Sequence, residues 1–282
     1  MNWRIILHGG ARSIAPGDAE ANRQGALQAL ACGVSILDAG GRALDAAEAV
    51  VRALEDNPVF NAGRGSVRNR DGEIELAAAI MDGATLDVGA VAVLRNVRNP
   101  VSVARRLLGE ETVLLAGPGA QSLAREIGAE PALCDPRAPA SPCDTVGCVA
   151  LDAAGHSAAA ISTGGLHGVR AGRVGDAPLP GCGFYADDQT GAVCFSGDGE
   201  RIMRTTLAAR AVAALESGAA AQSAAEAAIG ALARVGGEAG AIVIDRAGRF
   251  GCAHNSSHFT VALQSANDPP RVALQRSDLK DV

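Results

Sequence analysis

Aromatic residues are scarce in this 282-residue chain, at 2% of the sequence, although 48% of its residues are hydrophobic. The core must therefore be built from Ala, Val, Leu and Ile. A chain of this length can form one large α/β domain or two small ones, and either buries a sizeable core. The 35 glycines predict many tight turns and close backbone approaches.

Positive charge is not concentrated anywhere in the chain. The formal net charge is −6 without a basic cluster, so the electrostatic footprint of a nucleic-acid-binding protein is missing. Long apolar runs are missing too, since none approaches the roughly 18 to 20 residues that a membrane span requires. The apolar run near the amino terminus is too short for the core of a signal peptide. We expect neither a nucleic-acid nor a membrane partner.

Cysteine pairs are also lacking. The seven cysteines are odd in number and form no Cys-x-x-Cys motif, which argues against a zinc knuckle or a redox site. Free thiols in a reducing compartment are favoured instead. We therefore expect a cytoplasmic protein.

Hydrophobic periodicity divides the chain into helices and strands. Apolar positions at helical spacing predict helices over 19–38, 43–56, 200–215 and 220–235. Shorter apolar runs predict strands at 3–7, 87–94, 146–151, 157–161, 192–195, 241–244, 250–253 and 259–263, and a hairpin around Gly72 that ends in a strand at 73–81. Strands in both halves with helices grouped between them favour an α+β fold, a layered α/β/β/α sandwich, over alternating βαβ units.

A proline-rich segment marks the clearest internal boundary. Residues 130–142 carry four prolines in thirteen positions and show no periodicity. Such a run cannot join a helix or a central strand, so we expect an exposed loop.

Several glycine-rich turns have more than one interpretation. Gly9 and Gly10 follow a strand directly and allow either a plain tight turn or a backbone amide directed at an oxygen. The glycines of 60–66 resemble a phosphate loop only superficially, because no lysine follows. The turn at 117–119 lacks the third glycine of a dinucleotide site, so nucleotide binding has little support.

Taken singly, the polar residues of the second half have ordinary explanations. Thr145 opens an apolar run and is typical of a strand. Arg173 and Asp176 stand three apart in a loop and could form a surface ion pair. Thr163 and Ser196 could be turn residues that bond local backbone amides.

Taken together, these residues form six motifs in one order. The motifs are Phe-Asn-Ala-Gly-Arg-Gly-Ser at 60–66, Ala-Ile-Met-Asp-Gly at 79–83, Asp-Thr-Val-Gly at 144–147, Ser-Thr-Gly-Gly at 162–165, Gly-Arg-Val-Gly-Asp at 172–176 and Ser-Gly-Asp-Gly-Glu at 196–200. This order resembles the plant-type asparaginase and isoaspartyl peptidase family of N-terminal-nucleophile (Ntn) hydrolases. The resemblance extends from His8 to about Asn255 and implies the four-layer sandwich of that class.

The resemblance implies a precursor, residues 1–282 in one domain, that cuts itself between Asp144 and Thr145. The products would be an α subunit, 1–144, and a β subunit, 145–282. A threonine hydroxyl needs a base to take its proton, and a free α-amine on the same residue can serve. Such an amine titrates at about 7.7 to 8.0, which suits a general base. Because that nitrogen is an amide before cleavage, cleavage creates the catalyst.

Roles carry over to matching positions. Thr145 would attack the substrate, Thr163 would support its activation, and Ser196 with the Gly197 amide would form the oxyanion hole. Arg173 would bind the substrate α-carboxylate with its planar fork, and Asp176 would bind the α-ammonium. Gly199 would join Ser196 and Gly197 in substrate binding, and Asn61 and Gly10 would lie near the site of self-cleavage.

No cofactor for catalysis is implied, although a structural sodium ion is. Its loop would comprise Leu54, Glu55, Asn57, Phe60 and Ala62, with mostly backbone carbonyls as ligands. Side-chain identity therefore says little about whether the ion binds.

The family pattern predicts a self-cleaving hydrolase of β-aspartyl bonds, active on β-aspartyl dipeptides and L-asparagine and assembled as a dimer of αβ units. The alternatives are a glycosylasparaginase-like amidase and a catalytically silent homologue that binds amino acids. Cys143 stands where histidine is common, Ser196 where threonine is usual, and Ala77 where an acid is expected. These departures put substrate preference and cleavage efficiency in doubt.

Overall fold

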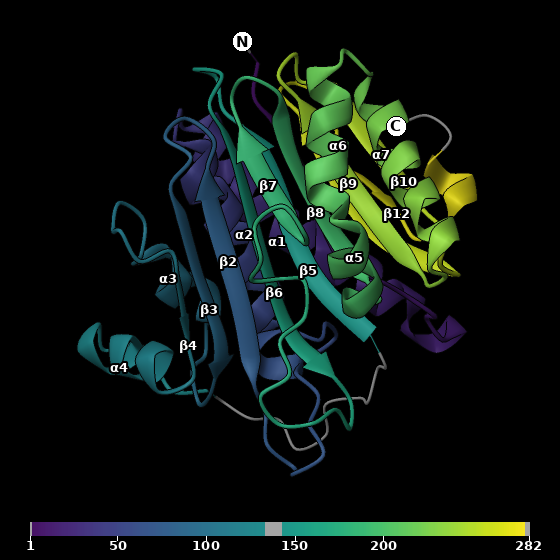
Figure 1. Ribbon diagram of the computed structural model, residues 1–282. Helices are drawn as coiled ribbons and strands as arrows, with labels where there is room; N and C mark the ends of the chain where they lie inside the picture. Colours follow the sequence, from purple (N-terminus) through teal and green to yellow (C-terminus); the bar gives the residue numbers. More distant parts are fainter. Residues whose placement is uncertain (1, 133–142, 280–282) are drawn as a thin grey trace.

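The computed structural model describes residues 2–132 and 143–279 and combines helices with two β-sheets (Figure 1). The larger sheet has the strand order β12-β11-β1-β5-β6-β2-β3-β4, and the smaller one β10-β9-β8-β7. The strands are β1 Arg4–Arg12, β2 Leu76–Asp82, β3 Val88–Leu94, β4 Leu114–Ala116, β5 Cys143–Leu151, β6 Ser157–Leu166, β7 Phe184–Asp187, β8 Gly191–Gly197, β9 Ala239–Asp245, β10 Phe250–His254, β11 His258–Ser265 and β12 Arg271–Ala273. The helices are α1 Ala19–Asp38, α2 Ala43–Asp56, α3 Pro100–Arg105, α4 Pro118–Glu126, α5 Gly199–Thr205, α6 Leu207–Glu216 and α7 Ala221–Gly230, with short 3₁₀ turns η1 Pro16–Asp18, η2 Gly63–Gly65, η3 Ala231–Arg234 and η4 Arg276–Leu279.

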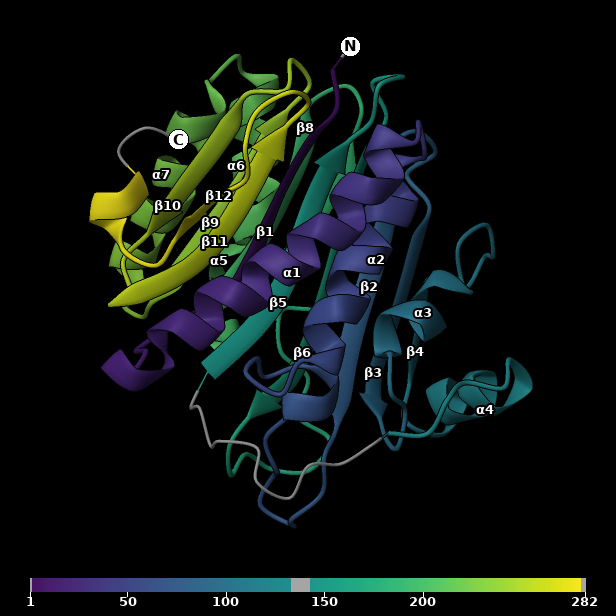
Figure 2. The ribbon, with the colours of Figure 1, turned by 180° about the vertical axis from the view of Figure 1, so that it is seen from behind.

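Helices α1 and α2 cover one face of the larger sheet (Figure 2). The apolar stripe of α2, which includes Ala46, Val50 and Leu54, is fully buried against that sheet. Close approach depends on small residues: a Cβ on Gly33 of α1 would stand 2.5 Å from Ile5 and 2.7 Å from Val50. With so few aromatic residues, the core is filled by short aliphatic side chains that bring the layers together.

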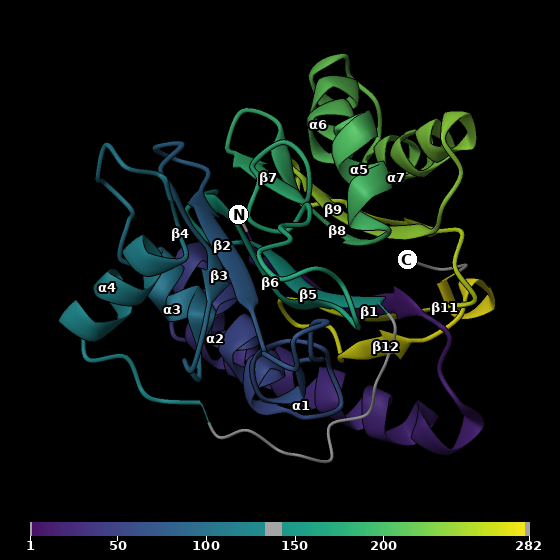
Figure 3. The ribbon, with the colours of Figure 1, turned by 60° about the horizontal axis from the view of Figure 1, so that its bottom comes forward.

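The other face of the larger sheet packs on the smaller sheet (Figure 3). This second core contains Ile6, Val149 and Ile161 from the larger sheet and Cys194 and Ile242 from the smaller one. A third core lies between the smaller sheet and α6 and α7. The class is therefore mixed α and β, with antiparallel pairing throughout the described sheets except between β3 and β4.

Several predicted elements are confirmed, including both amino-terminal helices and the strands at 87–94, 146–151 and 157–161, the last two of which pair as β5 and β6. The single helix predicted over 200–215 is wrong. Thr206 adopts the left-handed conformation, with φ of 49° and ψ of 56°, and this divides the segment into α5 and α6. The prediction of a hairpin around Gly72 is also wrong, because β2 begins only at Leu76 and pairs with β3 and β6. The sequence analysis also missed β7 and β12, which are short.

The residues after the first strand do not form the expected turn. Gly9 and Gly10 continue β1, and the pairing with β11 becomes irregular between His8 and Ala11. Gly10 has a φ of 107°, which a residue with a side chain adopts only under strain. A bulge of this kind redirects the strand and its amides.

Within the described ranges, no helix combines the length and apolar character needed to cross a bilayer. Of the expected proline-rich loop, positions 133–142 lie outside the described residues.

Candidate active site

Thr145 and Thr163 lie opposite one another on the adjacent strands β5 and β6. Both are buried, each with 6% of its surface exposed. The chain runs through Asp144 into Thr145 within β5, so the Thr145 nitrogen is an amide. Adjacent antiparallel residues bring their side chains to one face of the sheet, which places the two hydroxyl-bearing residues side by side.

The Thr145 amide bonds to the other sheet. It donates to Oγ of Ser196 on β8 over 3.3 Å, and the amide of Ala11 donates to the same oxygen over 3.0 Å. Ser196 is fully buried. Its hydroxyl thus joins three segments, β1, β5 and β8, at the point where the two sheets meet.

Asn61 holds the end of β6, just after Thr163. Its side-chain amide donates to the Gly165 carbonyl over 2.7 Å, and its backbone carbonyl accepts from the Gly164 amide over 2.8 Å. Its Oδ1 accepts from the Val67 amide over 3.0 Å. The Gly165 amide in turn donates to Oγ1 of Thr163 over 3.1 Å. A buried Asn61 therefore connects the loop after α2 to the end of β6.

Arg173 does not pair with Asp176, so the surface ion pair considered from the sequence is wrong. Arg173 instead binds Glu200 in α5, with Nε 2.9 Å from one carboxylate oxygen and Nη2 2.7 Å from the other. Asp176 is buried, and its Oδ2 has no hydrogen-bond partner within the described chain. Burial raises the pKa of Asp176 to about 7, an effect that the charge of Arg173 opposes. An unpartnered buried carboxylate beside a guanidinium is suited to a cationic ligand.

These residues surround one small pocket. Its lining comprises Thr145, Thr163, Gly165, Leu166, Arg173, Gly175, Asp176 and Gly197. The volume is about 10 Å³, close to what a single water molecule needs. Gly199 lies beside it, where an added Cβ would stand 2.8 Å from both the Arg173 Nη2 and the Asp176 Oδ1. The structure thus brings together the predicted nucleophile, its neighbour and both predicted substrate-binding side chains.

Of the predicted self-cleavage residues, Gly10, Asp144 and Thr145 lie in two strands, and Asn61 lies between α2 and η2. Asp144 directly precedes Thr145 in β5, and Gly10 lies in the irregular part of β1, next to the Ala11 amide that binds Ser196. A Cβ on Gly197 would meet the Glu238 carbonyl oxygen at 2.2 Å, so only glycine fits where β8 approaches β9.

His8 and Glu200 are functional candidates to which the sequence analysis assigned no individual role. His8 is fully buried, stacks on Phe259 with ring centroids 5.5 Å apart, and pairs with Gly147 in the sheet. Burial lowers the pKa of His8 to about 3, which the nearby Thr145 backbone only partly offsets. The imidazole is therefore neutral. Glu200 is the last residue of the sixth motif, and its place in that motif was the sequence signal that could have identified it.

The predicted sodium loop presents converging carbonyl groups. A Cβ on Gly65 would stand 2.1 Å from the Phe60 oxygen and 2.7 Å from the Pro58 oxygen, and one on Gly63 would stand 2.6 Å from the Glu55 oxygen. The carbonyls of Leu54, Asn57, Phe60 and Ala62 each accept one backbone hydrogen bond and keep a second lone pair. Backbone carbonyl oxygens are ligands that a hard cation prefers, so the oxygens of this loop fit a sodium ion. Among the described residues no group of His, Cys, Asp or Glu could hold a metal ion.

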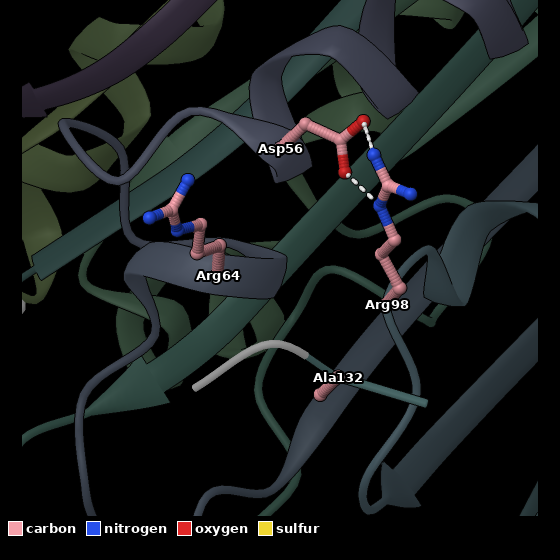
Figure 4. A pocket seen from close by; sticks show the side chains of 4 residues that line it. All are labelled: Asp56, Arg64, Arg98 and Ala132. Atoms are coloured by element: carbon pink, nitrogen blue, oxygen red, sulfur yellow. Dashed lines mark hydrogen bonds and ion pairs between the residues drawn. The ribbon is translucent and has the colours of Figure 1, made fainter. Parts of the chain in front are cut away.

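A second pocket lies next to this loop and is a weaker candidate for a substrate site (Figure 4). Arg98 faces Asp56 and forms two hydrogen bonds with it, of 2.8 and 3.0 Å, while Arg64 lies on η2 at the other side. Arg98 also bonds to Glu130. With both edges of this guanidinium engaged and no nucleophile among its lining residues, the pocket has no evident chemistry.

Comparison with known proteins places the chain in a family. The model of a family described as asparaginase matches residues 1–136 and 130–274. The chain is 40% identical over 276 residues to an isoaspartyl peptidase/L-asparaginase of Danio rerio, with 89% of each chain covered. It is 39% identical over 273 residues to the protein of that name from Homo sapiens, with 88% of each covered, and 42% identical over 238 residues to that from Rattus norvegicus, with 76% and 71% covered. The chain belongs to the asparaginase family.

Proposed function

We propose that this protein is a self-processing hydrolase of β-aspartyl bonds that acts as an isoaspartyl dipeptidase and L-asparaginase. The observation that carries the proposal is the pocket in which Thr145 and Thr163 face Arg173 and the unpartnered carboxylate of Asp176. Family membership and the names of the relatives support the same reaction. The fold is proposed to be the four-layer α/β/β/α sandwich of Ntn hydrolases, and the substrates are small molecules.

Self-cleavage is the proposed first step. Hydrolysis of the peptide bond between Asp144 and Thr145 divides the chain into an α subunit, 1–144, and a β subunit, 145–282, and converts the Thr145 amide into a free amine. Ser196 already accepts a hydrogen bond from this nitrogen in the continuous chain. The new amine then takes the proton of the Thr145 hydroxyl.

Hydrolysis then follows in two stages. Oγ1 of Thr145 attacks the side-chain carbonyl of the substrate, an ester forms, and the C–N bond breaks as the leaving amine or ammonia takes the proton. Water then cleaves the ester and releases aspartate. Ser196 and the Gly197 amide stabilise the oxyanion, and one such donor contributes about 10²–10³ in rate. Thr163 supports the nucleophile from the neighbouring strand.

Substrate recognition uses charge of both signs. Arg173 binds the α-carboxylate, Asp176 binds the α-ammonium, and Gly199 leaves space between them. Since Oδ2 of Asp176 is buried without a hydrogen-bond partner within the described chain, it is available for an ammonium group. A structural sodium ion in the loop from Leu54 to Ala62 would hold that loop, which includes Asn61, and no catalytic step passes through it. The assembly is proposed to be a dimer of αβ units in the cytoplasm.

Mass spectrometry combined with an activity assay tests the proposal. The purified protein is expected to give two fragments divided at Thr145 and to release ammonia from L-asparagine, while Thr145→Ala stays a single chain. A wild-type chain that remains intact after prolonged incubation contradicts the proposal and favours a silent amino-acid-binding homologue. Faster turnover of glycosylasparagine than of isoaspartyl dipeptides favours the amidase alternative.

A further inference from the structure

We propose that Glu200 is a positioning residue for substrate: it holds one edge of the Arg173 guanidinium, so that the other edge faces the pocket and stays apart from Asp176. This inference rests on the proposed function, because it explains how the site recognises a free α-amino acid. It assigns a role to a residue outside the pocket lining.

Arg173 and Glu200 form a bidentate ion pair, and their side chains differ in exposure. Nε and Nη2 of Arg173 bind the two oxygens of Glu200 at 2.9 and 2.7 Å. The Arg173 side chain is only 14% exposed, whereas that of Glu200 is 53% exposed. Glu200 thus reaches in from the first turn of α5, on the solvent side, and binds a guanidinium that lies inside. This planar contact fixes the orientation of the guanidinium as well as its place.

The remaining edge of Arg173 lies against glycine. A Cβ on Gly175 would stand 2.8 Å from Nη1, and a Cβ on Gly199 would stand 2.8 Å from Nη2. Glu200 uses one N–H on Nε and one on Nη2, so three of the five guanidinium N–H groups remain. Arg173 and Gly175 both line the pocket, so this edge borders the space that a substrate α-carboxylate would occupy.

Asp176 would compete for this free edge without Glu200. Nη2 of Arg173 and Oδ1 of Asp176 are each 2.8 Å from the same point beside Gly199, so the two atoms are no more than twice that distance apart. A guanidinium released from Glu200 would turn toward the buried carboxylate, and each group would then neutralise the other. Keeping them apart matters because the α-carboxylate and α-ammonium of an amino acid sit on one carbon and need both groups at once.

The test compares Glu200→Gln with a matched control, Glu48→Gln. Glu48 also binds an arginine, Arg105, but between α2 and α3, where neither residue lines the pocket. Steady-state kinetics are measured on L-asparagine and on L-asparaginamide, in which the α-carboxylate is replaced by an amide. Glu200→Gln is expected to be cleaved fully, to raise the KM for L-asparagine about tenfold, and to keep kcat within about twofold. The KM for L-asparaginamide is expected to stay unchanged, and Glu48→Gln to match wild type on both substrates.

Glu200→Asp keeps the negative charge and is expected to recover most of the affinity for L-asparagine. The inference is overturned if cleaved Glu200→Gln shows an unchanged or lower KM for L-asparagine, or if KM rises equally for both substrates. It is also overturned if Glu200→Gln fails to cleave, which would assign Glu200 to processing. An inactive or uncleaved wild type would instead overturn the proposed function, so the two failures are distinct.

Discussion

Oγ of Ser196 accepts hydrogen bonds from the amide of Thr145 at 3.3 Å and from the amide of Ala11 at 3.0 Å. One hydroxyl on the smaller sheet thereby holds both the proposed nucleophile and the irregular part of β1 on the larger sheet. Burial makes this oxygen hard to replace, because an amide left without an acceptor keeps its full cost of desolvation.

Ser196→Ala should impair chemistry as well as stability, because it also leaves the buried Ala11 amide without its acceptor. We expect kcat on L-asparagine to fall by about 10²–10³-fold through loss of an oxyanion donor. Initial rates of ammonia release from fully cleaved protein measure this. Ser196→Thr keeps the hydroxyl and should stay within about threefold of wild type. A Ser196→Ala enzyme with unchanged kcat would remove Ser196 from the mechanism.

Asn61→Ala should destabilise the fold and slow self-cleavage. The substitution removes a partly buried side-chain hydrogen bond to Gly165 and a buried one from Val67, so we expect a loss of about 2–3 kcal/mol in the free energy of unfolding. Urea denaturation measures the loss, and a denaturing gel follows cleavage. The control is Asp245→Ala, which removes bonds from a turn at the end of β9 away from Gly197. That variant should lose stability and still cleave normally. Equal cleavage rates in the two variants would refute a role for Asn61.

Binding of L-aspartate should weaken as the pH falls. Asp176 has a pKa raised to about 7, so below that value it becomes neutral and loses its attraction for an α-ammonium group. We expect Kd to rise about tenfold per pH unit below about pH 7 and to be nearly constant above it. Calorimetry on the cleaved enzyme measures this without requiring the Thr145 amine to act as a base. In Asp176→Asn, binding should be weaker at every pH and lack this dependence. A wild-type Kd that is flat from pH 5 to 8 would contradict the assignment.

Sodium should stabilise the protein if the carbonyl loop binds it. Replacing sodium chloride by tetramethylammonium chloride at equal ionic strength removes the ion and leaves screening unchanged. We expect Tm to drop by about 2–4 °C, because a ligand that binds only the folded state shifts unfolding. In Gly65→Ala the added Cβ would stand 2.1 Å from the Phe60 oxygen, so the difference between the salts should vanish. The same Tm for wild type in both salts would exclude a sodium site of useful affinity.

Much of the fold could be predicted from local patterns in the sequence. Helical spacing was enough to predict α1 and α2, and short apolar runs were enough to predict the paired strands β5 and β6. These predictions succeed because the residues that form the buried face of each element lie close together in the chain. The break at Thr206 was not visible, since the apolar pattern continues through a residue whose left-handed backbone separates α5 from α6.

The candidate site, too, could be predicted only in part from the sequence. The order of short motifs identified which residues to examine, and the structure places Thr145, Thr163, Arg173 and Asp176 around one pocket. The partner of Arg173 was decided only in three dimensions. Asp176 is three residues away in the chain, yet Arg173 binds Glu200, which is 27 residues away. Spacing along a loop does not fix the direction of a side chain, and the packing of α5 beside that loop does.

The amino acid sequence by itself determined the helices, the central strands and the identity of the polar residues, because periodicity and composition act locally. Only the tertiary structure decided that Gly9 and Gly10 extend β1, that Ser196 bonds across two sheets to Thr145, and that Oδ2 of Asp176 is buried without a hydrogen-bond partner among the described residues. Each of these depends on contacts between segments far apart in the chain, and burial sets their energies. Such contacts exist only once the sheets have packed.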